Sequence, residues 1–165
     1  MAKDPLSSEI HFWRLDPAEY ASTWNAGVGA EKVGGRWNPK GMTTVYAALD
    51  ASTAILEVAV HKNFEALDCK PHCLTQALVL DPSKIYVVQP ESIANANWLA
   101  PGTPSRSQQR FGADLLSQHP FVLVPSSVSR HSWNLLMNPQ LALGLYELVL
   151  QEPFALDGRL NRPLP

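Results

Sequence analysis

The order of the apolar segments is the feature that most constrains how this chain of 165 residues can fold. Short runs rich in β-branched and aromatic residues recur along the chain, and such runs predict strands. Helical patterns fall between some of these runs but not between all of them, so the strict alternation of a βαβ protein is absent. This order favours an α+β fold over a doubly wound parallel sheet. The expected strands are 10–15, 43–49, 73–80, 84–88, 121–127 and 145–156.

Three segments carry the signals of helices. Asp16 can cap a short helix in which Pro17 takes the first position. Asp50 precedes a cluster of small polar residues and predicts the start of a helix over 51–64. An amphipathic pattern predicts a further helix over 105–118.

Two stretches have no usable period and are expected to be irregular. The first runs from Gly27 to Gly41 and holds five glycines, so we expect a long loop with at most a short strand near Trp37. The second, 89–105, is rich in proline, asparagine and glycine and is expected to form a loop or a lid. Long irregular loops in small domains are often functional.

The composition is that of one folded domain, with 45% hydrophobic and 17% charged residues. The net charge of −2 and the lack of a basic block argue against direct contact with nucleic acid. No apolar run has membrane-spanning length and no leader pattern is seen, so we expect a cytoplasmic protein that does not contact a membrane. The expected parts are a flexible tail over 1–9, one domain over 10–160 and a second tail over 161–165.

The two cysteines do not predict a metal site. Cys69 and Cys73 lie on either side of His72, but a zinc site needs about four ligands and no second pair stands at finger spacing. We expect two reduced thiols near the start of a strand, and no metal.

Glu57 is the most informative single residue, because its neighbours on the expected helix are almost all apolar. We therefore expect this turn of the helix to be buried. A buried carboxylate is costly unless it is paired or hydrogen-bonded. Glu57 either reaches water from the margin of the helix or is an acid aimed into a cleft, and the residues alone leave both interpretations open.

Arg14 and Arg36 are the cations available to meet Glu57. Arg14 lies on an aromatic strand, and Arg36 lies in the glycine loop, where a ligand could approach the backbone closely. Two arginines and loop N–H groups could cradle a phosphate or a pyrophosphate. The alternative for Arg36 is a surface ion pair with Glu31 or Asp50. Neither a Walker loop nor a dinucleotide-binding glycine motif is present.

Three further polar residues are candidates for a ligand site. Tyr46 lies on the strand that leads into the helix of Glu57, where it could face a cleft and stack on a heterocycle or could belong to the core. Ser126 follows a strand, has no nucleophile elbow around it, and is expected to donate a hydrogen bond to a ligand. Asn134 is expected in a loop after that strand.

Five segments, in order, resemble the RES domain, a family found as the toxin of bacterial RES–Xre toxin–antitoxin pairs. The resemblance runs from about Phe12 to Leu160. The segments that carry it are "FWRL", "GGRWNPKG", "VYAALDASTAILEVAVH", "VPSSVSRHSWNLLMNP" and "FALDGRL".

The resemblance implies a fold similar to that of the ADP-ribosyltransferase toxins, with a split, strongly bent β core and helices outside it. It implies that NAD⁺ is degraded by phosphorolysis, with inorganic phosphate as co-substrate, releasing nicotinamide and an ADP-ribose phosphate. NAD⁺ would be the substrate, and no prosthetic group is implied. The implied catalytic residues are Glu57, Arg14 and Arg36, the implied NAD⁺-binding residues add Tyr46 and Ser126, and Trp37, Asn38, Ser127 and Asn134 are lesser candidates.

The resemblance also leaves rival functions open. Some relatives look like transferases that move ADP-ribose to a protein, and a domain without turnover that binds a nucleotide or the antitoxin is a third interpretation. The implied partner is an Xre-like helix-turn-helix antitoxin that blocks the cleft and binds DNA itself. A homodimer or a larger toxin–antitoxin assembly is compatible with the sequence.

Overall fold

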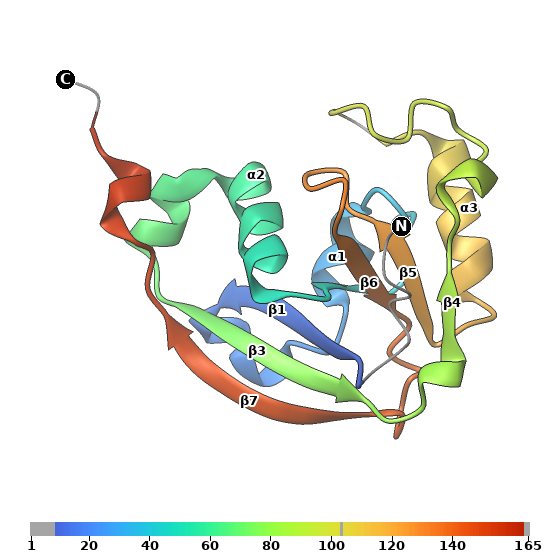
Figure 1. The fold of residues 1–165 in the computed structure, drawn as a ribbon, viewed down its shortest axis with the longest axis horizontal. Coiled ribbons are helices and arrows are strands. Elements are labelled where there is room, and N and C mark those ends of the chain that lie inside the picture. The colour runs from blue at the N-terminus through green and yellow to red at the C-terminus, as the bar shows by residue number, and fades with distance from the viewer. Residues whose placement is uncertain (1–8, 103, 164–165) are drawn as a thin grey trace.

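The computed structural model describes residues 9–102 and 104–163 (Figure 1). The tail expected over 1–9 lies outside these residues except for Glu9, and so do the last two residues of the tail expected over 161–165. The strands are β1 His11–Pro17, β2 Val45–Ala48, β3 His72–Val79, β4 Ile85–Val87, β5 Phe121–Pro125, β6 Trp133–Met137 and β7 Tyr146–Phe154. The α-helices are α1 Val28–Val33, α2 Ala51–Cys69 and α3 Arg106–Leu116, and short 3₁₀ helices span Ala18–Thr23, Pro82–Lys84, Pro90–Ser92 and Gly158–Asn161.

The strands form one mixed sheet in the order β4-β5-β6-β2-β1-β3-β7, in which β4 and β5 are parallel and the other neighbours are antiparallel. The sheet has two halves, because β1 and β2 are joined only where Trp13 lies opposite Ala48. Figure 1 shows the strong bend between the half with β1, β3 and β7 and the half with β4, β5 and β6. The predicted α+β class and the split, bent sheet are confirmed.

The side chains of each strand alternate between two layers, as a period of two requires. In β5, Phe121 and Leu123 enter the central core, whereas Val122 and Val124 enter a second core beneath α3. In β1, Phe12 enters the central core and Leu15 enters a third core beneath α2. The bent sheet therefore encloses one core and carries a helix on the outer face of each half.

Helix α2 begins where Asp50 was predicted to cap it. The Asp50 carboxylate accepts hydrogen bonds from the N–H of Thr53 at 2.8 Å and from its hydroxyl at 2.7 Å. The helix continues past residue 64 to Cys69, with a break at Asn63, whose φ is 64°. The Asn63 side chain accepts from the N–H of Ala66 at 3.0 Å and so caps the last turns.

The predicted role of Asp16 as a helix cap is wrong. Strand β1 extends through Pro17, and the following Ala18–Thr23 is a 3₁₀ helix without a side-chain cap. Asp16 instead pairs with Arg14, because residues two apart on a strand share a face.

The stretch from Gly27 to Gly41 also differs from the prediction, since it contains helix α1 and Trp37 is not in a strand. Flanking glycines hid this helix from the sequence pattern. Two contacts on the carbonyl of Ala30 support it: the N–H of Gly34 donates to it at 2.8 Å and the Asn38 amide at 3.0 Å.

Strand β6 was not predicted, and Asn134 lies on it and not in a loop. The strand pairs with β5 on one side and β2 on the other, and Leu135, Leu136 and Met137 are fully buried. A strand buried on both faces loses the alternation that marks a half-buried one.

Candidate active site

Glu57 lies in the second turn of α2 and accepts two hydrogen bonds from the other half of the sheet. Its Oε1 accepts from the Ser126 hydroxyl at 2.8 Å and from the Asn134 amide at 2.6 Å. Ser126 follows β5 directly, and Asn134 lies on β6 next to β2. Its other oxygen, Oε2, has no partner within the described part of the chain. The three residues therefore present a held carboxylate with one oxygen available to a ligand.

The backbone around Ser126 orients its hydroxyl toward Glu57. Ser126 is fully buried, and its oxygen accepts from the N–H groups of Val128 at 3.2 Å and Ser129 at 3.0 Å. A hydroxyl has one proton and two lone pairs. Since both acceptor positions are taken, the proton points to the Glu57 carboxylate.

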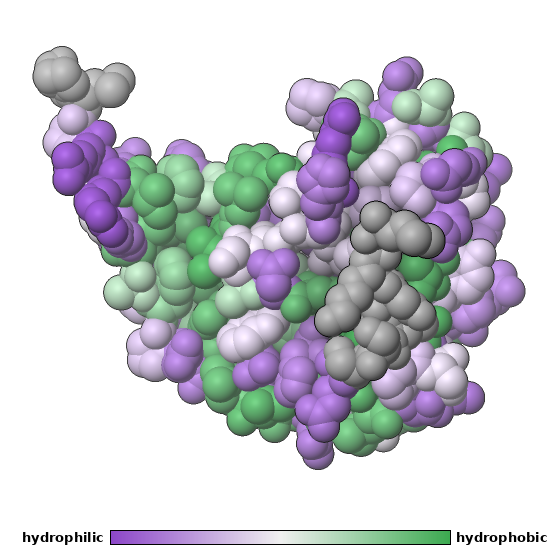
Figure 2. Space-filling model, viewed as in Figure 1, coloured by the Kyte–Doolittle hydropathy of each residue, from purple (hydrophilic) through white to green (hydrophobic). Residues whose placement is uncertain are grey.

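The helix around Glu57 is less buried than the sequence predicted. Glu57 itself is half-buried, while Leu56 and Val60 are 37% and 59% exposed. Figure 2 shows apolar surface over α2. The prediction failed because one face of α2 covers the β1–β3 half of the sheet and the opposite face is open to solvent.

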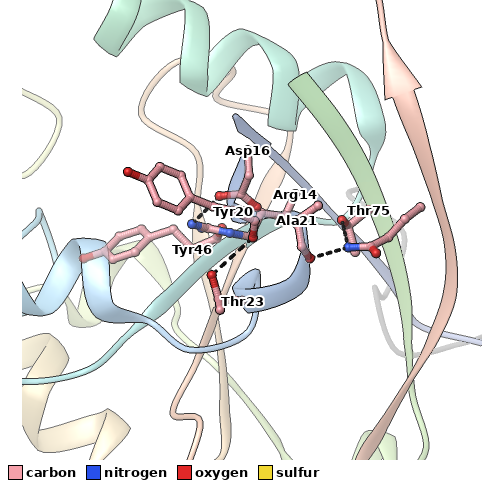
Figure 3. Close-up of polar contacts among 8 residues, drawn as sticks. Arg14, Asp16, Tyr20, Ala21, Thr23, Tyr46 and Thr75 are labelled. Carbon is pink, nitrogen blue, oxygen red and sulfur yellow. Dashed lines mark hydrogen bonds and ion pairs between the residues drawn. The ribbon is translucent and has the colours of Figure 1, made fainter. Parts of the chain in front are cut away.

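Arg14 lies between its own strand and β2 (Figure 3). Its Nη1 donates to the carbonyl of Tyr46 at 2.7 Å, and its Nη2 contacts Asp16 Oδ1 at 2.8 Å. The Arg14 side chain is 26% exposed and Asp16 is only 6% exposed. Burial raises the pKa of Asp16 above its ordinary value, although the Arg14 charge acts in the opposite direction.

This pair is incompletely satisfied. Arg14 Nε and Asp16 Oδ2 are buried and have no hydrogen-bond partner among the described residues. Much of the Arg14 charge is therefore balanced within the protein, while one N–H group and one carboxylate oxygen remain unmatched. Buried polar atoms of this kind are uncommon and often mark functional sites.

The Tyr46 hydroxyl holds the loop of Arg36 by hydrogen bonds to two of its residues. It donates to the Asn38 side chain at 2.6 Å and accepts from the N–H of Trp37 at 3.0 Å. Burial raises the pKa of this hydroxyl above its ordinary value, so it stays protonated and acts as the donor to Asn38. Asn38 is fully buried and its amide donates to the carbonyls of Ala30, Pro39 and Met42. Tyr46 and Asn38 thus shape the loop.

Two glycines permit the close contacts around this loop. A Cβ on Gly35 would lie 2.5 Å from the Tyr46 hydroxyl oxygen, and a Cβ on Gly112 of α3 would lie 2.0 Å from the Trp37 carbonyl oxygen. Neither approach is possible with a larger residue. Helix α3 therefore packs with its backbone against that of Trp37, whose ring is buried 6.0 Å from the ring of Trp98.

Arg36 points toward the segment that precedes α3. Its Nη1 donates to the carbonyl of Trp98 and to that of Ala100 at 3.3 Å. Arg36 lines a pocket of about 250 Å³ together with Gln108 of α3 and residues of the preceding segment, namely Asn95, Asn97, Trp98, Ala100, Pro101, Pro104 and Ser105. Because these partners are neutral, Arg36 keeps its positive charge at the pocket wall.

The structure brings only some of the predicted residues together. Glu57, Ser126 and Asn134 form one cluster, and Arg14 reaches the backbone of Tyr46 on the adjoining strand. Neither Arg14 nor Arg36, the two cations available to Glu57, forms an ion pair with it among the described residues. The expected alternative for Arg36, an ion pair with Glu31 or Asp50, is not formed there either.

Ser127, the neighbour of Ser126, makes no side-chain hydrogen bond in the described ranges. Of the two serines, Ser126 is the one that contacts Glu57.

Three residues near the site were missed by the sequence reasoning. Asp16 could have been found from its position two residues after Arg14 on a strand. Trp98 and Gln108 gave no such signal, because only the fold brings the segment before α3 to the loop of Arg36.

The chain has known relatives. The model of the RES domain family matches residues 11–157, so the chain belongs to the RES domain family. A protein named Toxin Res from Yersinia enterocolitica is 35% identical over 145 residues, covering 86% of this chain and 92% of the relative. A protein named Prs ADP-ribosylating toxin from a Sphingobium species is 31% identical over 139 residues, covering 78% of this chain and 81% of the relative.

A solved structure shares the fold. It is the MbcT–MbcA toxin–antitoxin complex of M. tuberculosis, with a TM-score of 0.73 and 19% identity over 90% of this chain and 85% of the matched chain. Within the described ranges, no helix has the length and apolar character to cross a membrane.

Proposed function

We propose that this chain is the toxin of a toxin–antitoxin pair and that it consumes NAD⁺ at the cluster of Glu57, Ser126 and Asn134. The observation that carries the proposal is the Glu57 carboxylate, which is held by two donors through Oε1 and keeps Oε2 for a ligand. Membership of the RES domain family and the toxin names of two relatives support it.

The reaction breaks the bond between the ribose C1′ and the nicotinamide nitrogen. The bonding electron pair leaves with nicotinamide, which becomes neutral, and positive charge develops on the ribose. A phosphate oxygen then forms the new bond to C1′, so NAD⁺ and phosphate give nicotinamide and ADP-ribose phosphate. The transition state resembles an oxocarbenium ion, as in glycoside hydrolysis.

Glu57 supplies negative charge for this transition state. The carboxylate is already oriented by Ser126 and Asn134 before substrate arrives, and preorganised charge needs no reorganisation during the reaction. Its free oxygen accepts a hydrogen bond from a ribose hydroxyl or faces the developing positive charge. No strong acid is needed, because nicotinamide leaves as a neutral molecule.

The two arginines have different roles in the proposal. Arg36 has neutral partners and keeps its charge for the phosphates of NAD⁺. Arg14 is partly neutralised by Asp16, so we assign it to holding β2 and to a weaker contact with phosphate. Tyr46 and Asn38 shape the loop that carries Arg36.

A second candidate function is the transfer of ADP-ribose to a protein side chain. The relative named as an ADP-ribosylating toxin favours it, at 31% identity. The first bond to break is the same, and only the acceptor of the C1′ carbon differs. The site of Glu57 serves either acceptor equally well.

The experiment that separates these functions is a product analysis. The purified chain is incubated with NAD⁺, with and without inorganic phosphate, and with a cell extract freed of small molecules. Mass spectrometry should show ADP-ribose phosphate only when phosphate is present. Label on a protein would support the transferase, and intact NAD⁺ under every condition would refute both enzymatic functions.

We also propose an antitoxin partner with an Xre-like helix-turn-helix domain. The fold of this chain matches a chain of a solved toxin–antitoxin complex at a TM-score of 0.73, which supports an antitoxin partner; the Xre-like type comes from the resemblance to the family. Co-expression of an Xre-like antitoxin that binds this chain should suppress NAD⁺ loss and growth arrest together. A suppressed arrest with continuing NAD⁺ loss would contradict the proposal that NAD⁺ consumption is the toxic activity.

A further inference from the structure

The pocket in front of helix α3 contains a buried side chain that has no partner. Gln108 is 2% exposed, and its amide oxygen and nitrogen are both buried without a hydrogen bond in the described part of the chain. Gln108 lines the pocket of about 250 Å³ that also holds Arg36 and Trp98. A buried amide without partners is unfavourable, so this arrangement suits a ligand that completes it.

Hydrogen bonds hold the walls of the pocket in place. Ser105 caps α3 by accepting from the N–H of Gln108 at 3.2 Å, and it also accepts from the Asn95 amide at 3.1 Å. Arg36 binds the carbonyls of Trp98 and Ala100 and so ties the other wall to the glycine loop. The first N–H groups of a helix have no partners within it and favour negative charge.

These features together match one chemical class. An amide that offers a donor and an acceptor side by side pairs with the edge of adenine, which presents an amino group beside a ring nitrogen. Trp98 offers an aromatic face at the same pocket, and Arg36 and the start of α3 offer positive charge for a phosphate. The volume lies below the range of about 300–1,000 Å³ for whole-ligand pockets, so it suits one half of a dinucleotide.

We propose that this pocket binds the adenylate half of NAD⁺, with Gln108 pairing to the adenine edge and Arg36 contacting the adjoining phosphate. The inference rests on the proposed function, in which the nicotinamide half lies at Glu57. The link between the two places is β2. Tyr46 holds the loop of Arg36 through its hydroxyl, and two residues along the strand Ala48 lies opposite Asn134, the donor to Glu57.

The test measures binding without turnover, so it does not depend on NAD⁺ being consumed. The ligands are AMP, purine riboside monophosphate, which lacks the amino group of AMP, and nicotinamide mononucleotide. Binding to the full chain is measured by calorimetry for the wild type and for Gln108→Met. The matched control is Gln118→Met, because Gln118 is exposed beyond the end of α3 and does not line the pocket.

The wild type should bind AMP about tenfold more tightly than purine riboside monophosphate, because only AMP completes the pair with Gln108. Gln108→Met should weaken the binding of AMP by about tenfold and should remove the preference for AMP over purine riboside monophosphate. Nicotinamide mononucleotide should bind both proteins alike, and Gln118→Met should behave as wild type. The Tm of Gln108→Met should be unchanged or raised, since the protein itself gives the amide no partner.

Three results would overturn the inference: no binding of AMP, an AMP affinity unchanged by Gln108→Met, or an equal loss for all ligands with a lowered Tm. Failure of the proposed function is distinguishable from these results. If NAD⁺ stays intact but AMP binding depends on Gln108, the adenine pocket stands and the enzymatic function falls. If NAD⁺ is consumed but Gln108→Met leaves the affinity for AMP unchanged, the enzymatic function stands and the adenine pocket is refuted.

Discussion

Glu57 and Asp16 are two carboxylates near the junction of the two half-sheets, and they differ in burial and in the charge of their partners. Glu57 is half-buried and its partners, Ser126 and Asn134, are neutral donors. Asp16 is almost fully buried and its partner is the cation Arg14. The charge of Asp16 is therefore largely balanced inside the protein, whereas that of Glu57 is oriented but not balanced.

This difference shows where an external positive charge would be stabilised. A carboxylate already paired with a guanidinium has little attraction left for a developing cation. A carboxylate held by neutral groups keeps its full negative charge, and its attraction grows when substrate excludes water. Glu57 is accordingly the carboxylate suited to an oxocarbenium-like transition state, and Asp16 is suited to holding Arg14.

The largest expected effect comes from removing the charge of Glu57. In Glu57→Gln the amide oxygen can still accept from Ser126 and Asn134, so the fold and the Tm should be retained. NAD⁺ consumption should fall by about 10²–10³-fold or more, because the charge opposite the developing cation is lost. The rate is measured as NAD⁺ loss over time, with growth inhibition as a second readout.

The matched control is Glu65→Gln, an exposed glutamate on the same helix. It should consume NAD⁺ at the rate of the wild type. Near-normal activity of Glu57→Gln would mean that the negative charge of Glu57 does not stabilise the transition state.

A smaller effect should separate two neighbouring serines. Ser126→Ala removes one of the two donors to Glu57 and should lower NAD⁺ consumption by about 10–100-fold, the range expected for a hydrogen bond to a charged group. Ser127→Ala removes no side-chain hydrogen bond of the described residues and should stay near wild type. Rates are compared well below the Tm of each variant, since Ser126→Ala also leaves two loop N–H groups unpaired. The reverse ranking of the two serines would contradict the role given to Ser126.

Much of the fold was predictable because it follows from local signals. The cap at Asp50, the strands around Phe12 and Val122 and the amphipathic α3 each carry their own pattern. Strand β6 was missed because its burial on both faces removes the alternation. Helix α1 was missed because glycines flank it, and because the Asn38 amide that contacts its Ala30 carbonyl comes from outside the helix.

The site was predictable as a set of residues but not as a set of pairs. Glu57 and Ser126 were both candidates, yet 69 positions separate them, and their contact arises only through the arrangement of α2 and β5. Charge alone indicated only that Arg14 and Arg36 were available to Glu57. The fold instead brings Arg14 to Asp16 and Arg36 to backbone carbonyls, because neighbouring strand and loop positions decide which partner is within reach.

Arg36 allows a third test, with a smaller expected effect, of how a charged side chain with only neutral partners acts on substrate. Arg36→Ala removes a cation that has only neutral partners, so the KM for NAD⁺ should rise about tenfold while kcat changes little, as expected when uniform binding is lost. Arg110→Ala makes the same charge change at an exposed position of α3 and should leave both parameters unchanged. A fall in kcat at constant KM would mean that Arg36 acts on the transition state and not on bound NAD⁺.

The smallest expected effect is on the pH dependence of stability, and it tests Asp16, the carboxylate that is paired with Arg14. The pKa of Asp16 is raised in the folded state, so the folded protein holds this proton more tightly than the unfolded chain does. The contribution of Asp16 to the free energy of unfolding should therefore be greatest below the ordinary aspartate pKa of 3.8 and should decline as pH rises toward the folded-state value.

Urea unfolding of the wild type and Asp16→Asn across this interval isolates that contribution. The wild type should lose stability relative to Asp16→Asn as pH rises, because the asparagine carries no proton to lose. The carboxylates of Asp81 and Asp157, whose pKa values are lowered by hydrogen bonds, act with the opposite sign but equally in both proteins. If the wild type instead gained stability relative to Asp16→Asn as pH rises, the ion pair with Arg14 would outweigh the effect of burial. The folded protein would then stabilise Asp16 as an anion.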